Sequence, residues 1–389
     1  MADEIVASGR RTRLALTRRR VLAAGIAVAA GATRGSGAEA KSLADIVAAF
    51  DREREWRGIP SISVALVEGA RVNLHQRGVR SASRGGEVSA ETPYQAASIS
   101  KTVAAMTALA LSAAGHVALD TNIATYLKRW HLPQLPSAAP RPVTLRRLFG
   151  MTAGRNVPGY LGYPVGAALP DDVRILNGTA PANSLSVRIV TLPGTVRAYS
   201  GGGCQIAQVA MEDAMGKPFA DLAGDFVLRP LAMRHSGFFQ PPDPSQQSGF
   251  AVAHDDAGHE IAGGWHVYPE LAAAGLWSTP ADLAQIIIAM IAANKGDARI
   301  VFGNDGLSAM LTPVDNLGYG IGVALAGHRR VAMKRGNNLG FRSGLVACPG
   351  TGQGAVVMTN GNDGEPVVNA VLDALARHYR WPATAPWPE

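Results

Sequence analysis

The chain has 389 residues, of which 47% are hydrophobic and 17% are charged. This composition excludes a disordered protein and supplies enough apolar material for the core of two packed lobes. The formal net charge is +7, but residues 1–40 hold seven arginines and only three acids, so roughly +3 remains on residues 41–389. A charge this small, without a basic run after Arg34, argues against nucleic-acid binding.

The first 40 residues are predicted to be an export signal. Arg18, Arg19 and Arg20 precede an apolar stretch, 21–33, that is too short to span a bilayer. A small-x-small cleavage pattern follows at 38–40, and the adjacent arginines resemble a twin-arginine signal. We therefore expect an exported protein, periplasmic or extracellular, without a stable membrane span. A basic N-terminal arm is the alternative interpretation.

The elements after the signal begin with helix and hairpin patterns. Apolar residues share one face over 42–56, which predicts a helix. Residues 59–67 and 72–79 are rich in β-branched side chains and flank a turn at Gly69, which predicts a β-hairpin.

Further along the chain, helices and then short strands are expected. Apolar spacing predicts helices over 98–114, 280–294 and 366–381. Residues 116–260 mix short helical stretches with loops rich in proline and glycine. The predicted late strands are 318–326, 329–334, 344–348 and 354–359.

Strand patterns at both ends of the chain predict an α+β fold with one antiparallel sheet built from the two ends. Helices would flank this sheet, and a second, mostly helical lobe would come from the middle. We expect one domain at 41–389, with an α/β lobe at 41–95 and 262–389 and a helical lobe at 96–261.

The first element with chemical potential is Ser98-Ile99-Ser100-Lys101, at the start of a predicted helix. Residues at i and i+3 lie on one helix face, so the hydroxyl and the amine are within mutual reach. A serine needs a base to become a strong nucleophile, and a partly desolvated lysine can act as one. The tetrad is common by chance, so it needs context.

Two later elements supply that context. Tyr199 stands beside a glycine run, where a phenol near an ammonium can transfer protons. Lys334, Arg335 and Gly336 end a strand-like stretch, where a cation followed by glycine suits a cleft edge. Taken alone, Tyr199 reads as a surface residue and the basic triplet as a strand end.

The order S-x-x-K, Tyr-x-x, K-x-G resembles the serine β-lactamase and penicillin-binding protein superfamily. The closer similarity is to its class C-like branch, which includes esterases and D-amino-acid peptidases. Family-like stretches cover most of the chain after the signal, at 58–67, 94–106, 191–203, 275–284, 318–325 and 337–345. The resemblance implies an α/β lobe, an all-helical lobe and a site between them.

The resemblance also implies roles for residues that match the three elements. Ser98 would be the acylated nucleophile, Lys101 its base, and Tyr199 a partner in proton transfer. Residues 334–336 would line the cleft. The backbone N–H groups of Ser98 and of a residue near Asn337 would form an oxyanion hole.

Two departures from the branch narrow the expected chemistry. Gly201 stands where the second element usually has Asn, which removes an amide that would contact Lys101 and the substrate. Arg335 is an unusual and bulky residue beside the cleft. We therefore expect acyl transfer from a small-molecule or peptide ester or amide, in preference to true β-lactam breakdown. A penicillin-binding protein without turnover, or a degenerate scaffold, is the alternative.

Other enzyme classes fit less well. No G-x-S-x-G elbow is present, which argues against an α/β hydrolase. His254, Asp255, His259 and His266 match no zinc spacing, so neither a metal nor another cofactor is expected. Cys204 and Cys348 are expected to be buried free thiols, although export would permit a disulfide.

Overall fold

The structure is a computed structural model. It describes residues 42–133, 141–243, 245, 247–297, 302, 305–317, 319–326 and 331–383. The predicted export signal lies outside the described residues, and everything below concerns the compact unit that begins at Lys41.

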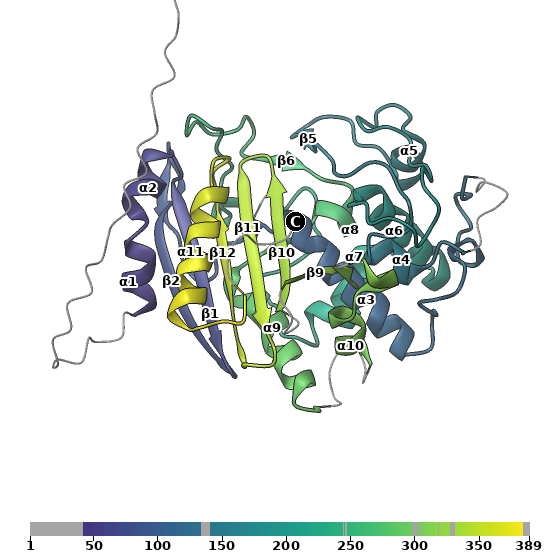
Figure 1. Ribbon diagram of the computed structural model, residues 1–389. Helices are drawn as coiled ribbons and strands as arrows, with labels where there is room; N and C mark the ends of the chain where they lie inside the picture. Colours follow the sequence, from purple (N-terminus) through teal and green to yellow (C-terminus); the bar gives the residue numbers. More distant parts are fainter. Residues whose placement is uncertain are drawn as a thin grey trace, which may run out of the picture. The chain divides into compact units, whose positions relative to one another are not determined.

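A single antiparallel sheet of eight strands joins the two ends of this unit (Figure 1). Its order is β3-β2-β1-β12-β11-β10-β9-β8, so β1 from the beginning pairs with β12 from the end. The predicted α+β fold with a sheet from both chain ends is confirmed. The strands are β1 Ser61–Glu68, β2 Arg71–Ser81, β3 Gly85–Glu87, β8 Tyr319–Gly320, β9 Val323–Ala326, β10 Val331–Asn338, β11 Phe341–Cys348 and β12 Gln353–Thr359.

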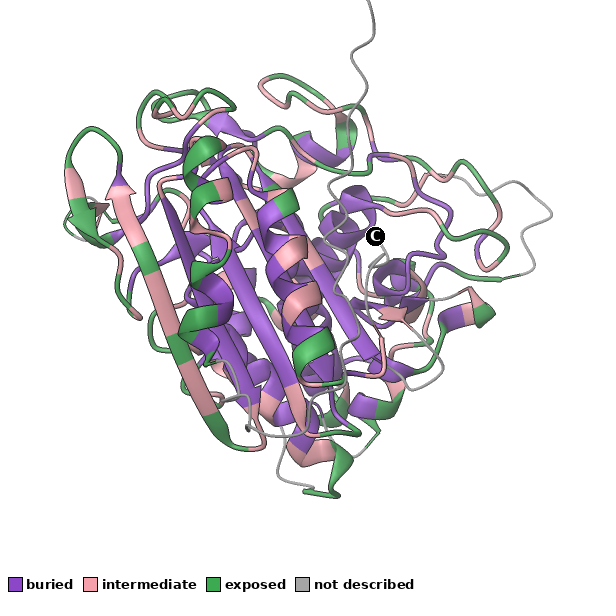
Figure 2. Cartoon of the chain, turned by 60° about the vertical axis from the view of Figure 1, so that its left-hand side comes forward, coloured by how far each residue is buried: buried purple, intermediate pink, exposed green. Residues whose placement is uncertain are grey.

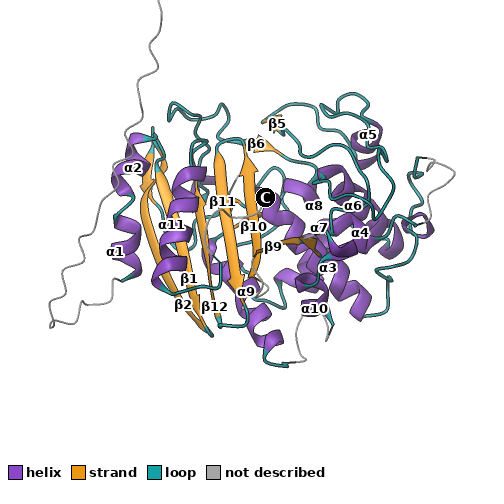
Figure 3. Ribbon diagram, viewed as in Figure 1, coloured by secondary structure: helices purple, strands orange, loops and turns teal. Residues whose placement is uncertain are grey.

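Helices cover both faces of the sheet. On one face lie α1 (Leu43–Ala48), α2 (Asp51–Trp56) and α11 (Glu365–His378), and α9 (Pro280–Asn294) packs on the other (Figure 3). The central strands are therefore buried along nearly their whole length, while β2 toward the edge is only partly buried (Figure 2). This explains why β1, β11 and β12 read as continuous apolar runs instead of alternating ones.

Most of the remaining helices, with β5 and β6, lie beyond β10 and carry most of the middle of the chain (Figure 1). The helices are α3 Ser100–Ala113, α4 Leu145–Phe149, α5 Asp172–Asn177, α6 Gly201–Met215, α7 Phe219–Ala223, α8 Leu271–Ala274 and α10 Gly306–Leu311. Two short pairs join them, β4 (Tyr94–Gln95) with β7 (Trp277–Ser278) and β5 (Tyr163–Pro164) with β6 (His266–Val267).

Several boundaries differ from those predicted. The helix expected over 42–56 is broken into α1 and α2, because Ala49 and Phe50 end one helix before Asp51 starts the next. The strand expected to end at Lys334 continues to Asn338, since pairing with β11 extends to the turn at Leu339 and Gly340. The helix over 280–294 has the predicted bounds.

The two cysteines are free and buried, as predicted. Among the described residues, no helix has the length and apolarity needed to span a membrane.

Candidate active site

Ser98 and Lys101 lie at the turn that leads into α3. Ser98 is partly exposed on a 3₁₀ turn, Ala97–Ile99, and Lys101 is buried in the first turn of the helix. Lys101 Nζ donates a hydrogen bond of 2.9 Å to Ser98 Oγ. Ala97 has a φ of 50°, a strained conformation for alanine that the surrounding packing must hold in place. The hydroxyl is thus presented from a constrained turn with an amine beside it.

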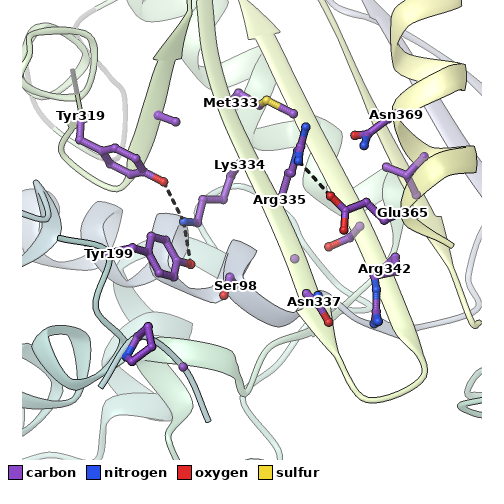
Figure 4. A pocket seen from close by; sticks show the side chains of 16 residues that line it. Ser98, Tyr199, Tyr319, Met333, Lys334, Arg335, Asn337, Arg342, Glu365 and Asn369 are labelled. Carbon is purple, nitrogen blue, oxygen red and sulfur yellow. Dashed lines mark hydrogen bonds and ion pairs between the residues drawn. The ribbon is translucent and has the colours of Figure 1, made fainter. Parts of the chain in front are cut away.

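Tyr199 approaches the same hydroxyl from the start of α6. The Ser200 side chain caps this helix, which holds Tyr199 just ahead of its first turn. The phenol accepts a 3.0 Å hydrogen bond from Lys334 Nζ (Figure 4). Burial alone would raise the pKa of Tyr199, but the charges of Lys101 and Lys334 and the polar interactions with Ser98 and Lys334 lower it to about 8. A fraction of phenolate therefore exists near neutral pH.

Lys334 is buried on β10 between two phenols. Its Nζ donates to Tyr199 Oη at 3.0 Å and to Tyr319 Oη at 3.4 Å (Figure 4). Burial alone would lower the pKa of Lys334, but its interactions with Tyr199 and Tyr319 raise that pKa above its usual value. Nζ also lies 4.4 Å from the ring centre of Tyr199. Lys334 is thus a fixed cation that favours the deprotonated form of Tyr199.

Gly336 allows β10 to approach the turn that carries Ser98. A Cβ at this position would collide with the Ala96 carbonyl and the Ser343 hydroxyl and would press on Ala97. The sequence interpretation explained this glycine by its place at a cleft edge. In the structure, the contact with residues 96–97 already requires it.

The edge of β10 next to Ser98 extends past the residues that pair with β9. β9 pairs with β10 only from Val331 to Met333, and Asn337, farther along, is exposed at the cavity. In an antiparallel strand, alternate N–H groups point away from the paired neighbour, so some of those beyond Met333 point away from β11. These N–H groups and that of Ser98 are the candidates for the oxyanion hole that the family resemblance implies.

Arg335 lies on the other side of the strand from Lys334. It forms an ion pair of 2.9 Å with Glu365 at the start of α11 (Figure 4). Its side chain retains 23% of its exposure, so it borders the cavity while being held by the helix. The bulky Arg335 side chain, which the sequence places beside the cleft, is therefore directed toward α11.

The three sequence elements meet at one cavity of about 480 Å³. Its wall includes Ser98, Tyr199 and every residue from Lys334 to Asn337, together with Pro158 and Gly159 from the loop before α6. This volume suits a small-molecule substrate or one residue of a peptide.

Gly201 lies against an aromatic ring. A Cβ at this position would be 3.0 Å from Cε2 of Tyr160 and 3.4 Å from Cα of Gly159. The Gly201 N–H donates to the Pro158 carbonyl at 3.0 Å, which ties the 158–160 loop to the first turn of α6. Tyr160 therefore occupies space that a longer residue at 201 would need.

Sequence reasoning missed two groups that touch the site. The Ala273 carbonyl, at α8, accepts a 2.7 Å hydrogen bond from Lys101 Nζ, and Tyr319 accepts one from Lys334. Tyr319 lies in one of the family-like stretches, which was a usable signal. A backbone carbonyl has no residue-type signal at all.

The histidines considered as metal ligands have other partners. The buried His254 ring bonds to the Asn360 carbonyl through Nδ1 and accepts from Ala82 N through Nε2. His266 Nδ1 contacts the Leu161 carbonyl. In the described part of the chain, no three His, Cys, Asp or Glu side chains are grouped as metal ligands would be.

Comparison with known proteins agrees with this geometry. A family model described as Beta-lactamase matches residues 46–378. The chain is 26% identical over 228 residues to the esterase EstB of Burkholderia gladioli. That match spans 56% of each protein, so the chain corresponds to little more than half of this curated relative.

Solved structures share the fold. The octameric penicillin-binding protein homologue from Pyrococcus abyssi superposes with a TM-score of 0.70 at 21% identity, covering 88% of this chain and 78% of that one. SurE superposes with a TM-score of 0.67 at 20% identity, with the same coverage of 88% and 78%. At these identities the likeness concerns the fold alone.

Proposed function

Because the chain belongs to the beta-lactamase family, we propose that it is a serine hydrolase that forms an acyl-enzyme on Ser98. The observation that carries the proposal is the position of Ser98 Oγ. It borders the cavity, accepts a 2.9 Å hydrogen bond from Lys101 Nζ, and shares the cavity lining with Tyr199, whose pKa it helps to lower. A hydroxyl with proton-transfer partners within hydrogen-bond reach is the requirement for nucleophilic catalysis.

Acylation begins when Ser98 Oγ bonds to the substrate carbonyl carbon and gives its proton to the Tyr199 phenolate. The N–H groups of Ser98 and of the β10 edge stabilise the negative charge on the carbonyl oxygen. The bond to the leaving group then breaks, and Tyr199 returns the proton to the departing alcohol or amine. In the second step, water attacks the acyl carbon and gives its proton to Tyr199, and Ser98 recovers a proton as the acid leaves.

The proposal gives Tyr199 the role of proton acceptor that the family resemblance assigned to Lys101. Its pKa of about 8 lies close to working pH, where a general base is most effective. Lys101, which donates a hydrogen bond to Ser98, and Lys334 supply the positive charge that keeps the phenolate accessible.

Ester or small-amide substrates are proposed in preference to β-lactams. Gly201 offers no side-chain amide to a substrate, and the Tyr160 ring fills the neighbouring space. The similarity to an esterase points the same way.

The test combines turnover with intact-mass measurement on the purified protein. We expect hydrolysis of a chromogenic short-chain ester that is lost in Ser98→Ala, and little turnover of a fluorescent penicillin. A stable penicillin adduct without turnover of either probe would instead support the penicillin-binding alternative. Ester turnover that survives in Ser98→Ala would overturn the assignment.

We also propose that the protein is exported from the cytoplasm before it acts as a hydrolase. The arginine block and the apolar stretch of residues 18–33 support this proposal. The double change Arg18→Lys with Arg19→Lys should retain the precursor in the cytoplasm. Unchanged fractionation into the periplasm or medium would contradict this.

A further inference from the structure

The segment around α8 contacts the first turn of α3 and the end of β10 through backbone groups that lie close together in the sequence. The Ala273 carbonyl accepts from Lys101 Nζ at 2.7 Å. The Ala274 carbonyl accepts from Asn338 Nδ2 at 3.2 Å, and Leu276 N–H donates to Ser100 Oγ at 3.0 Å. The position of α8 thus determines where one of the acceptors of Lys101 lies.

α8 is too short to secure itself. It has only four residues, and the side chain of Glu270 makes no capping hydrogen bond to it. The first N–H groups of a helix have no partner within the helix and must find one elsewhere. One of these, Ala272 N–H, donates to Oε1 of Gln208 on α6 at 2.9 Å.

Gln208 is itself held in place. It is buried, at 2% exposure, and its Nε2 donates to Asp172 Oδ1 at 3.0 Å. A continuous series of contacts therefore runs from Asp172 through Gln208 to α8, and from Ala273 through Lys101 to Ser98 Oγ.

We infer that Gln208 is a positioning residue, which fixes the Ala273 carbonyl so that it directs Lys101 Nζ at Ser98 Oγ. The inference rests on the proposed function and deepens it. Glycine at 201 has no side-chain amide to offer Lys101, whereas the Ala273 carbonyl accepts from Lys101 Nζ at 2.7 Å. A displacement of about 1 Å at such a distance from the chemistry can lower a rate by roughly 100-fold.

The first test is Gln208→Met, which keeps a long unbranched side chain but removes both hydrogen bonds. Gln205→Met is a matched control. Gln205 lies one turn earlier on α6, is fully buried and donates to the same Asp172 Oδ1 at 2.8 Å. We expect kcat for the ester to fall about 10- to 100-fold in Gln208→Met, with KM changed by less than about twofold, and both nearly unchanged in Gln205→Met. Equal losses in the two variants would overturn the inference.

A rescue experiment separates positioning from folding. In Gln208→Glu, the protonated carboxyl can still accept from Ala272 and donate to Asp172, but the ionised carboxylate faces Asp172 with like charge. Glu212, Glu270 and Arg129 also act on Asp172 and are unchanged in this variant. The ratio of its kcat/KM to that of the wild type should fall as pH rises. The same ratio for Gln208→Met should be flat. A pH-independent ratio for Gln208→Glu would contradict the role.

Crystal structures make the outcome independent of turnover. In Gln208→Met, α8 should shift, and Lys101 Nζ should lose hydrogen-bond distance to Ala273 O or Ser98 Oγ. Retention of both contacts would overturn the inference even if the wild type proves inactive. Failure of a fluorophosphonate to label wild-type Ser98 would instead count against the proposed function.

Discussion

At the scale of single residues, the site depends on charge placed around a buried phenol. Lys101 Nζ lies 5.1 Å and Lys334 Nζ 4.4 Å from the ring centre of Tyr199. Two cations this close favour the phenolate, and they outweigh the cost of burying it. In the proposed mechanism, Ser98 gains its reactivity from these neighbours.

The pH dependence follows from the pKa of Tyr199. Because this pKa is lowered to about 8, phenolate increases as pH rises through that value. We expect kcat/KM for ester hydrolysis to rise toward a plateau above pH 8 in the wild type. In Tyr199→Phe the rate should drop about 100- to 10,000-fold and the rising limb should disappear. An unaltered pH profile in Tyr199→Phe would assign the base to another group.

The contact between Gly201 and Tyr160 predicts a coupled pair. Gly201→Asn should lower ester hydrolysis and the melting temperature, because the new side chain must displace the Tyr160 ring. Tyr160→Ala alone leaves a void, whereas the double variant Gly201→Asn with Tyr160→Ala should recover part of the loss. A double-mutant cycle on melting temperature measures the coupling. Additive effects would show that the two residues do not compete for space.

At the scale of elements, the site is assembled from strand edges and helix starts. Ser98 precedes α3, Tyr199 precedes α6, and Lys334 lies inside β10. Such positions place side chains at the ends of rigid segments, where packing of the segment sets their direction. Turns that join these segments therefore contribute to the site without touching it.

One such turn is held by Asp315, just before β8. Asp315 accepts hydrogen bonds from Thr152 Oγ1 at 2.7 Å and from Arg147 Nε at 3.1 Å. It has a φ of 49°, so these contacts also hold a strained backbone. Burial alone would raise its pKa, but the hydrogen bonds of Arg147 and Thr152 lower it.

We expect Asp315→Ala to reduce the free energy of unfolding by about 1–3 kcal/mol in urea denaturation at pH 7. Because the pKa of Asp315 is lowered in the folded state, the stabilisation by its carboxylate is fully present above the unfolded-state pKa of about 4. This stabilisation is lost as the pH falls through the folded-state pKa. The difference in unfolding free energy between Asp315→Ala and the wild type should therefore shrink in acid.

The control is Asp120→Ala, since Asp120 pairs with the neighbouring Arg146 but is 68% exposed. Asp120→Ala should lower the free energy of unfolding by less than about 1 kcal/mol. An equal decrease in Asp120→Ala and Asp315→Ala would contradict the structural role of Asp315.

At the scale of the whole molecule, the sheet and the helices around α3 share one large apolar core, and a second cluster fills the space under α1 and α11. Among the described residues, the buried members of both clusters lie between Leu43 and Trp381. The cavity lies where β10 meets the starts of α3 and α6. The lining of this cavity therefore comes from both groups of elements.

Because we propose that residues 1–40 are an export signal, their deletion should leave stability and ester hydrolysis unchanged. Urea denaturation and kcat/KM of the truncated protein, compared with the full chain, provide the measurement. A loss above about 1 kcal/mol would mean that the export segment contributes to the folded domain.

The sequence by itself determined the local helices and strands and the residues available for catalysis. The apolar spacing over 280–294 marks a helix with the observed bounds, and strand patterns at both ends of the chain indicate the sheet that joins them. The three elements at Ser98, Tyr199 and Lys334 could be read as parts of one site through their order and family resemblance. Such signals work because helix period, turn chemistry and motif spacing act over a few residues.

Only the tertiary structure decided how distant segments meet. It placed the Ala273 carbonyl on Lys101, Tyr319 on Lys334, and the Tyr160 ring over Gly201. It also showed that Gly336 is required by the turn at residues 96–97. These contacts join residues from 15 to 240 positions apart, where close packing determines which atoms touch.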